Sequence, residues 1–155
     1  GFDMSAETTL RLAKKHKNIK GMKDSTNNLA HTKSIIYGVT KEVPDFEVYS
    51  GFDDHFLPNV MAGGAGCIAA ISHIKPKLWS EWVDSYNNKS FSKMIEINRK
   101  IDSLMYLYSV QSNFMLIFKK IMKSEGLNIT ENTNFPFENI DNDIVNTIIN
   151  EVKEI

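Results

Sequence analysis

The feature that most constrains the fold is an alternation of short strand-like segments with helix-length segments over the first 70 residues of this 155-residue chain. The strand-like runs are rich in β-branched, aromatic and small apolar residues, and the helix-length runs begin with capping residues. Strands are expected at residues 18–24, 46–51 and 66–70, and helices at residues 5–16, 29–41 and 53–64. Strands that alternate with helices form a parallel sheet covered by helices. The chain is therefore expected to be of the α/β class.

A different pattern begins at Pro76, where helices follow one another without strands between them. These helices are expected at residues 76–88, 90–110, 112–125 and 141–154. An apolar stripe at helical spacing is interpreted as a packing surface, and it consists of Met94, Ile97, Ile101, Leu104 and Tyr108. Three strands make a poor sheet on their own, so the first part of the chain is expected to be a piece of a larger sheet.

Composition excludes several classes of protein. The 18 basic and 19 acidic residues nearly cancel, which argues against a nucleic-acid partner. A single cysteine cannot form an internal disulfide, and no apolar run approaches the roughly 18 residues of a membrane span. The opening residues GFDMS lack a signal-peptide pattern. We therefore expect a cytoplasmic protein without a membrane partner, starting either at a processing site or within a longer chain.

The segment Gly21-Met22-Lys23-Asp24-Ser25 places a lysine at the end of a predicted strand. Because side chains alternate along a strand, Lys23 and Gly21 should share one face and Met22 and Asp24 the other. A neutral lysine amine can attack a ketone, and a dry site favours the neutral amine. The alternative is a lysine that extends from the strand end into solvent. Spacing alone leaves both interpretations open.

Three ordered motifs carry a resemblance that favours the first interpretation: GMKDSTNNLAH, VYSGFDDHFL and GGAGCIAAISHIKP. Over residues 3 to 110 the chain resembles the dihydrodipicolinate synthase/N-acetylneuraminate lyase family of pyruvate-dependent class I aldolases. The resemblance implies strands 6–8 of a (β/α)8 barrel, with residues 1–88 as the C-terminal half of the barrel and residues 89–155 as a C-terminal helical extension. It also implies that Lys23 forms a Schiff base with pyruvate or another 2-oxo acid.

The resemblance implies substrate contacts near the strand ends, each with a structural alternative. Gly51 would let substrate approach the backbone, or it is a turn glycine. The main-chain carbonyl of Ile68 would line the pyruvate pocket, while its side chain fills the barrel. Ser25 would contact substrate beside the lysine, or it forms a turn. The acids that would bind substrate hydroxyls, or else cap a helix, are Asp53 and Asp54.

No metal or cofactor is expected. A protonated imine on Lys23 serves as the electron sink, and His55 beside two aspartates does not converge with them on a helix. The family's Gly-Thr-Thr loop and its catalytic tyrosine are not found in the sequence. The implied partners are therefore a missing N-terminal half of the barrel, the 2-oxo acid substrate and further copies of the chain, because the family is commonly tetrameric.

The aldehyde partner is the least determined feature. Asp24 departs from the sialic-acid lyases, which usually carry an aromatic residue after the lysine. The motifs look most like bacterial aldolases that cleave 2-keto-3-deoxy-gluconate to pyruvate and glyceraldehyde. The alternatives are dihydrodipicolinate synthase, which joins pyruvate to aspartate semialdehyde in lysine biosynthesis, and a catalytically inactive half barrel that serves as a binding module.

Overall fold

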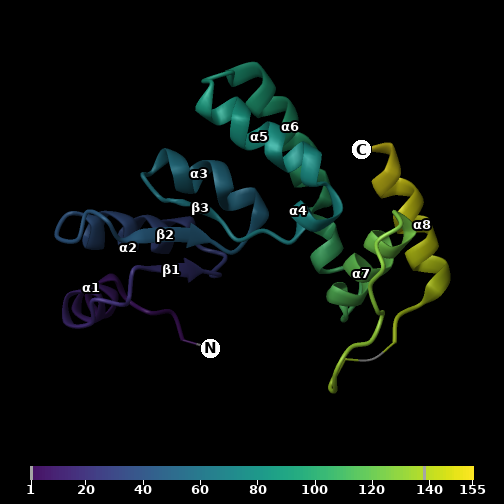
Figure 1. Cartoon of the computed structure of the whole chain (residues 1–155), viewed down its shortest axis with the longest axis horizontal. Coiled ribbons are helices and arrows are strands. Elements are labelled where there is room, and N and C mark those ends of the chain that lie inside the picture. The colour runs from purple at the N-terminus through teal and green to yellow at the C-terminus, as the bar shows by residue number, and fades with distance from the viewer. Residues whose placement is uncertain (1, 138) are drawn as a thin grey trace. The chain divides into compact units, whose positions relative to one another are not determined.

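A computed structural model describes residues 2–137 and 139–155, and Figure 1 shows its elements in chain order. The chain divides into two compact units, Gly1–Ala69 and Ala70–Ile155. The first unit contains all three strands and the second is helical. Each unit is built around its own apolar core.

The first unit is an α/β layer structure. Its elements are α1 (Ala6–Lys15), β1 (Gly21–Asp24), α2 (Leu29–Thr40), β2 (Glu47–Ser50), the 3-10 turn η1 (Asp53–His55), α3 (Phe56–Met61) and β3 (Gly66–Cys67). The strands lie in the order β1-β2-β3, and both neighbouring pairs are parallel. The predicted parallel sheet is confirmed.

Capping residues set the starts of the two long helices in this unit. The Ser5 hydroxyl accepts a hydrogen bond from the main-chain N–H of Thr8 at the start of α1. The Asn28 side chain accepts from the N–H groups of Ala30 and His31 at the start of α2. These bonds satisfy donors that have no partner inside the helix, so both helices begin close to where the sequence predicted.

The third strand is shorter than the predicted segment 66–70. Only Gly66 and Cys67 pair with β2, and the N–H of Ile68 makes a last bond of 2.9 Å to the Ser50 carbonyl. β2 ends at Ser50, because the chain then turns into η1. β3 therefore has no further ladder on this side, and the prediction of a strand through residue 70 was wrong.

The helices cover the face of the sheet that carries Met22 and Val48. These two residues are paired in register, and they join an apolar cluster with residues of α1 and α2 such as Ala13, Ile35 and Val39. The other face carries the register pair Lys23 and Tyr49. The predicted alternation along β1 is thus confirmed, with its apolar side against the helices.

The second unit contains α4 (Ile71–Ile74), α5 (Pro76–Asn87), α6 (Phe91–Leu104), η2 (Met105–Tyr108), α7 (Phe114–Ser124) and α8 (Asn142–Glu154). The predicted stripe is buried at Met94, Ile97, Ile101 and Leu104, while Tyr108 contacts the rings of Phe114 and Phe118. The short helix α4 was not predicted. No helix in the described residues is long and apolar enough to cross a membrane.

Candidate active site

Lys23 lies at the carboxyl end of β1, one residue before the strand ends. Its side chain is exposed on the face of the sheet that the helices do not cover. Carboxyl ends of parallel strands in α/β folds are where ligands bind, because the loops that follow the strands meet there. Lys23 therefore occupies the position that the sequence predicted, although the described residues leave its amine in contact with solvent.

Gly51 lies directly against the Lys23 side chain. Its N–H donates to the Asp24 carbonyl at 2.7 Å, so the residue is held at the end of β1. A Cβ atom at residue 51 would be 2.9 Å from Lys23 Cε and from Ser25 Cα, and it would collide with the Ser25 hydroxyl. Such contacts are closer than real Cβ atoms show. The absence of a side chain at residue 51 therefore leaves room for the lysine chain itself, and the structure brings Lys23, Ser25 and Gly51 together.

Ile68 follows β3 directly, and its side chain is 51% exposed. Its N–H group donates a hydrogen bond of 2.9 Å to the Ser50 carbonyl. The strand β3 lies next to β2 in the sheet, with β1 on the far side of β2. Ile68 thus stands at the same carboxyl end of the sheet as Lys23, two strands away.

The two predicted acids occupy different environments in the turn η1. Asp53 is fully buried and makes interactions within the protein. Asp54 is partly exposed, but its Oδ1 atom is buried and has no hydrogen-bond partner among the described residues. The Nδ1 atom of His55 is likewise buried without a partner in the same part of the chain. Unsatisfied buried polar atoms are rare, so Asp54 is the acid with unused hydrogen-bonding capacity.

Cys67 reports on the electrostatics of this region. Burial raises the pKa of its thiol to about 12, and the charges of Asp53 and Asp54 act in the same direction. A hydrogen bond with Ser50 and the positive charge of Lys23 lower the pKa by less. The thiol is therefore protonated at neutral pH and unsuited to act as a nucleophile. The same interactions show that Lys23, Asp53 and Asp54 all act on one buried atom.

Asp24 forms a polar network that sequence reasoning missed. Its side chain is 3% exposed and accepts from the Thr32 hydroxyl at 2.6 Å, His31 Nδ1 at 3.0 Å and the Thr26 N–H at 3.1 Å. Burial alone raises the pKa of Asp24, but the hydrogen bonds from Thr32, His31 and Thr26 outweigh it and hold the pKa below its ordinary value. The alternation along β1, which turns Asp24 toward α2, was the available signal.

His31 lies in the first turn of α2, and its side chain is 16% exposed. Besides Asp24, it contacts the Met4 carbonyl through Nε2 at 3.2 Å. Thr32, the next residue of α2, donates to the same Asp24 carboxylate, so the first turn of α2 faces the end of β1. A histidine in this turn is therefore directed at β1 rather than at solvent.

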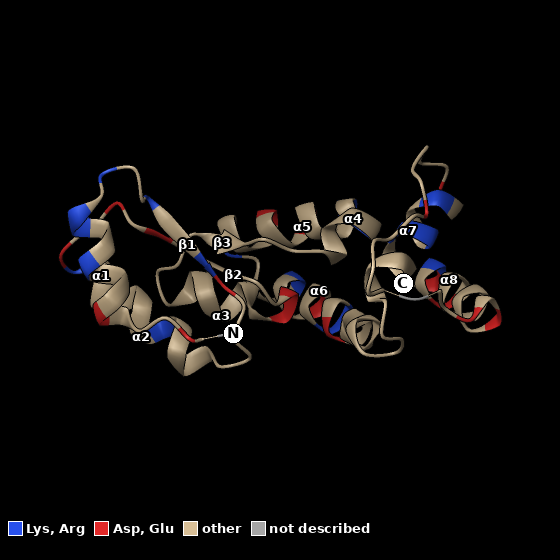
Figure 2. Ribbon diagram, turned by 90° about the horizontal axis from the view of Figure 1, so that it is seen from below, with Lys and Arg blue, Asp and Glu red and all other residues tan. Residues whose placement is uncertain are grey.

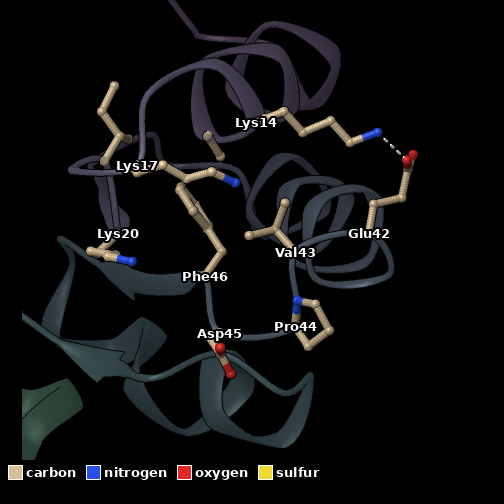
Figure 3. Close-up of a pocket in the computed structure, with 10 residues that line it drawn as sticks. Lys14, Lys17, Lys20, Glu42, Val43, Pro44, Asp45 and Phe46 are labelled. Carbon is tan, nitrogen blue, oxygen red and sulfur yellow. Dashed lines mark hydrogen bonds and ion pairs between the residues drawn. The ribbon is translucent and has the colours of Figure 1, made fainter.

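The opposite, amino end of the strands has a different character. A cavity of about 310 Å³ lies there between the end of α1 and the segments that precede β1 and β2. Figure 2 shows basic residues gathered on α1 and the loop after it, and Figure 3 shows Lys14 reaching to Glu42 across the cavity rim. Lys17 and Lys20 also line it. This cavity is remote from the strand ends where Lys23 lies.

Metal ligation has no support in the described residues, where no group of three His, Cys, Asp or Glu side chains is placed to hold a metal ion. Lys23, Gly51, Ser25, Ile68 and the acids of η1 form the candidate site. This arrangement offers an accessible amine on Lys23 beside Gly51, with two acids in η1, the turn that follows β2.

Two curated proteins are similar to much of this sequence. The probable 2-dehydro-3-deoxy-D-pentonate aldolase YjhH of Escherichia coli strain K12 is 31% identical over 127 residues, which cover 82% of this chain and 42% of that protein. The 4-hydroxy-tetrahydrodipicolinate synthase of Hydrogenobaculum sp. strain Y04AAS1 is 33% identical over 113 residues, which cover 73% of this chain and 38% of that protein. The chain thus spans less than half the length of either.

A solved structure shows the same fold. YagE, a prophage protein of the dihydrodipicolinic acid synthase family from Escherichia coli K12 determined in complex with pyruvate, matches with a TM-score of 0.87 at 22% identity. The match covers 96% of this chain and 51% of YagE. The predicted fold class is confirmed: α/β, with the strands and helices of the C-terminal part of a (β/α)8 barrel. Because the model of the dihydrodipicolinate synthetase family matches residues 1–155, the chain belongs to that family.

Proposed function

We propose that the protein containing this chain is a pyruvate-dependent class I lyase in which Lys23 forms a Schiff base with the substrate. One observation carries the proposal: Lys23 lies at the carboxyl end of a parallel strand, and Gly51 leaves space beside its Cε atom. An amine in that position can reach a carbonyl carbon presented from the loop side of the sheet. Membership of the family supports the same role for this lysine.

In the proposed chemistry the Lys23 amine forms an imine with the substrate and is regenerated at the end. The neutral Nζ atom adds to the 2-oxo carbon, a general acid protonates the hydroxyl of the resulting carbinolamine, and water leaves to give a protonated imine. The C3–C4 bond of the substrate then breaks, its electron pair moves to the imine nitrogen, and a base takes the proton of the C4 hydroxyl as the aldehyde leaves. Protonation of the resulting enamine at C3 and hydrolysis release pyruvate and regenerate Lys23. The synthetic direction runs through the same steps in reverse.

We also propose that another part of the barrel covers the face of the sheet that carries Lys23. In the described residues Lys23 is exposed, whereas a neutral amine is favoured by a dry environment. A missing half of the barrel, held in the same protein or in a partner chain, would cover this face and supply the proton relay. We further propose that the complete protein assembles as a homo-oligomer, a tetramer by analogy with the family.

For the substrate we propose a 2-keto-3-deoxy sugar acid, cleaved to pyruvate and an aldehyde such as glyceraldehyde. The similarity to a probable 2-dehydro-3-deoxy-D-pentonate aldolase supports this class. Contacts to the substrate would come from Gly51, the Ile68 carbonyl, Ser25 and the acids of η1, of which Asp54 is partly exposed and Asp53 is buried.

The second candidate activity is condensation of pyruvate with aspartate semialdehyde. Its support is the 33% identity to a 4-hydroxy-tetrahydrodipicolinate synthase. A third candidate, from another class, is an inactive half barrel that binds other molecules, which accords with a chain that spans 42% of the aldolase it resembles. These candidates differ in whether an imine forms and in which aldehyde takes part in the reaction.

Borohydride trapping with pyruvate tests the proposal on the natural gene product that carries this sequence, together with any chain that co-purifies. Intact mass and peptide mapping should find a reduced adduct on Lys23 alone. The Lys23→Ala variant should lose the adduct and all turnover, while Lys33→Ala, which removes an exposed lysine of α2, should keep both. A wild-type protein without an adduct, or an adduct on another lysine, would overturn the Schiff-base assignment and favour the binding module.

A further inference from the structure

A buried polar network lies behind Lys23, on the opposite face of β1. Asp24 follows Lys23 in the strand, so its side chain points toward the helices while the lysine points away from them. Asp24 Oδ2 accepts from the Thr32 hydroxyl at 2.6 Å and from His31 Nδ1 at 3.0 Å. Asp24 Oδ1 accepts from the Thr26 N–H at 3.1 Å. The carboxylate thus joins the strand, the turn after it and the first turn of α2.

His31 extends this network to the segment before α1. One ring nitrogen faces the Asp24 carboxylate, and the other faces the Met4 main-chain carbonyl at 3.2 Å. Both of these partners are hydrogen-bond acceptors. The Thr26 hydroxyl, 3.4 Å from Nδ1, is the remaining polar group near the ring. His31 therefore connects the acid to a third segment of backbone.

The main chain at Asp24 is fixed from the other side as well. Its carbonyl accepts from the Gly51 N–H at 2.7 Å, which ties the end of β1 to the end of β2. The residue beside Lys23 is thereby held by its side chain on the helix side and by its carbonyl within the sheet. Since one planar peptide unit joins the two residues, a rotation of that unit at Asp24 also moves the backbone of Lys23.

We propose that Asp24 is a positioning residue for Lys23, with Thr32 and His31 as the anchors through which it acts. The proposal rests on the proposed function, because it assigns the network to the lysine's approach to the 2-oxo carbon. Asp24 touches no reacting atom. It holds the strand end so that the amine starts from one fixed direction, and small displacements of a reacting group can lower rates by roughly 100-fold.

Thr32→Val and Asp24→Asn remove this positioning with little change in shape. Valine lacks the hydroxyl that donates to Asp24, whereas Thr32→Ser keeps a hydroxyl and serves as the matched control. In Asp24→Asn, one side-chain oxygen becomes an amide nitrogen, which cannot accept a hydrogen bond, so either the Thr26 bond to Oδ1 or the Thr32 and His31 bonds to Oδ2 are lost. A second control, Lys33→Ala, changes an exposed neighbour on α2.

The experiment measures the rate of borohydride-trapped imine formation on the natural gene product as pyruvate concentration is varied. Thr32→Val should lower the rate at saturating pyruvate by roughly 10- to 100-fold and leave the half-saturating concentration unchanged, because positioning acts on the reacting step. Thr32→Ser and Lys33→Ala should match the wild type. If Asp24→Asn folds, it should behave like Thr32→Val. If it does not fold, the comparison of Thr32→Val with Thr32→Ser tests the inference.

Two results would overturn the inference while leaving the proposed function intact. One is a Thr32→Val protein that traps pyruvate at the wild-type rate. The other is a variant in which only the half-saturating concentration rises, which would assign the network to substrate binding. Failure of the proposed function is recognised separately, because then the wild-type protein itself forms no adduct on Lys23.

Discussion

The two ends of the three-stranded sheet hold their charged groups in opposite ways. At the carboxyl end, Asp24 is 3% exposed and accepts three hydrogen bonds from different parts of the chain. At the amino end, Lys14 and Glu42 form an ion pair whose side chains are 50% and 47% exposed. Asp24 is thus a buried charge that holds backbone segments together, whereas Lys14 and Glu42 form an ion pair on the surface.

The physical basis of this difference is desolvation. Removing one partner from a buried carboxylate leaves a charge without the hydrogen bonds that compensate its burial, and this is costly. An exposed pair exchanges its partner for water and loses little. We therefore expect substitutions at the carboxyl end to change reactivity and stability, and substitutions at the amino end to change neither.

The largest expected effect concerns Cys67, the only cysteine in the sequence. Its pKa of about 12, compared with an ordinary value of 9.0, lowers the thiolate fraction roughly 10³-fold at a given pH below both values. Alkylation by iodoacetamide at pH 8 should be slower in the native protein than in the unfolded protein by a similar factor, followed by mass spectrometry. Equal rates in the two states would contradict a raised pKa and the burial of the Cys67 thiol in the native protein.

The next effect comes from adding one methyl group at Gly51. In Gly51→Ala the new Cβ atom would lie 2.9 Å from Lys23 Cε, so the lysine or the strand end must move. We expect the rate of pyruvate trapping to fall about 100-fold. The free energy of unfolding should fall by about 1–3 kcal/mol, measured by denaturant titration, because the site is overpacked.

Gly126→Ala is the control for this change. Gly126 adopts a φ of +94°, and a Cβ there meets no atom within 4 Å. The variant should lose about 1–2 kcal/mol of stability from backbone strain and keep the wild-type trapping rate. If Gly51→Ala traps pyruvate as fast as Gly126→Ala, then the space beside Lys23 has no part in the reaction.

The pH dependence of stability tests the buried acid. Because the pKa of Asp24 is held below its ordinary value of 3.8, the folded state is favoured above that value, and the contribution is lost as pH falls through the lowered pKa. Thr32→Val should therefore cost about 1.5–3 kcal/mol at neutral pH, and this difference from the wild type should shrink in acid. Urea unfolding across pH 2.5 to 7 measures it. A difference that stays constant with pH would mean that Thr32 does not act through the carboxylate.

The smallest effect is expected at the amino end. Hydrogen bonding and charge from Lys14 hold the pKa of Glu42 below its ordinary value, but the group is exposed and screened by solvent. Glu42→Gln should leave the free energy of unfolding and the trapping rate within experimental error. A clear loss of either would contradict the contrast between the two ends of the sheet.

Periodicity and capping predicted most of the fold. A strand was expected at residues 18–24, because the run is too short for a helix and ends in turn formers, and the structure places it at Gly21–Asp24. The helix before it was expected from the Ser5 cap, which the structure confirms. The errors arose where a neighbour decides the structure. β3 ends at Cys67 because β2 ends at Ser50, and no local signal within residues 66–70 contains that fact. The short helix α4 was missed because its four residues are too few to show a period.

The candidate site was predictable as far as single residues and alternation allow. Lys23, Gly51 and Ser25 were proposed from their motif, and the structure brings them together. The network around Asp24 was not foreseen, because it joins residues 24 and 31 with the main chain of residue 4. Contacts of this kind follow from the path of the chain between elements, which composition and spacing do not specify.

The contact between Gly51 and Lys23 gives a rule for judging related sequences. A lysine in the first motif alone does not identify a chain that can form an imine, because any residue larger than glycine at position 51 would occupy the volume of its side chain. If Lys23 forms the proposed imine, the pair gives a two-position test: lysine with glycine is expected in chains that form it, and lysine with a bulkier residue in chains that do not.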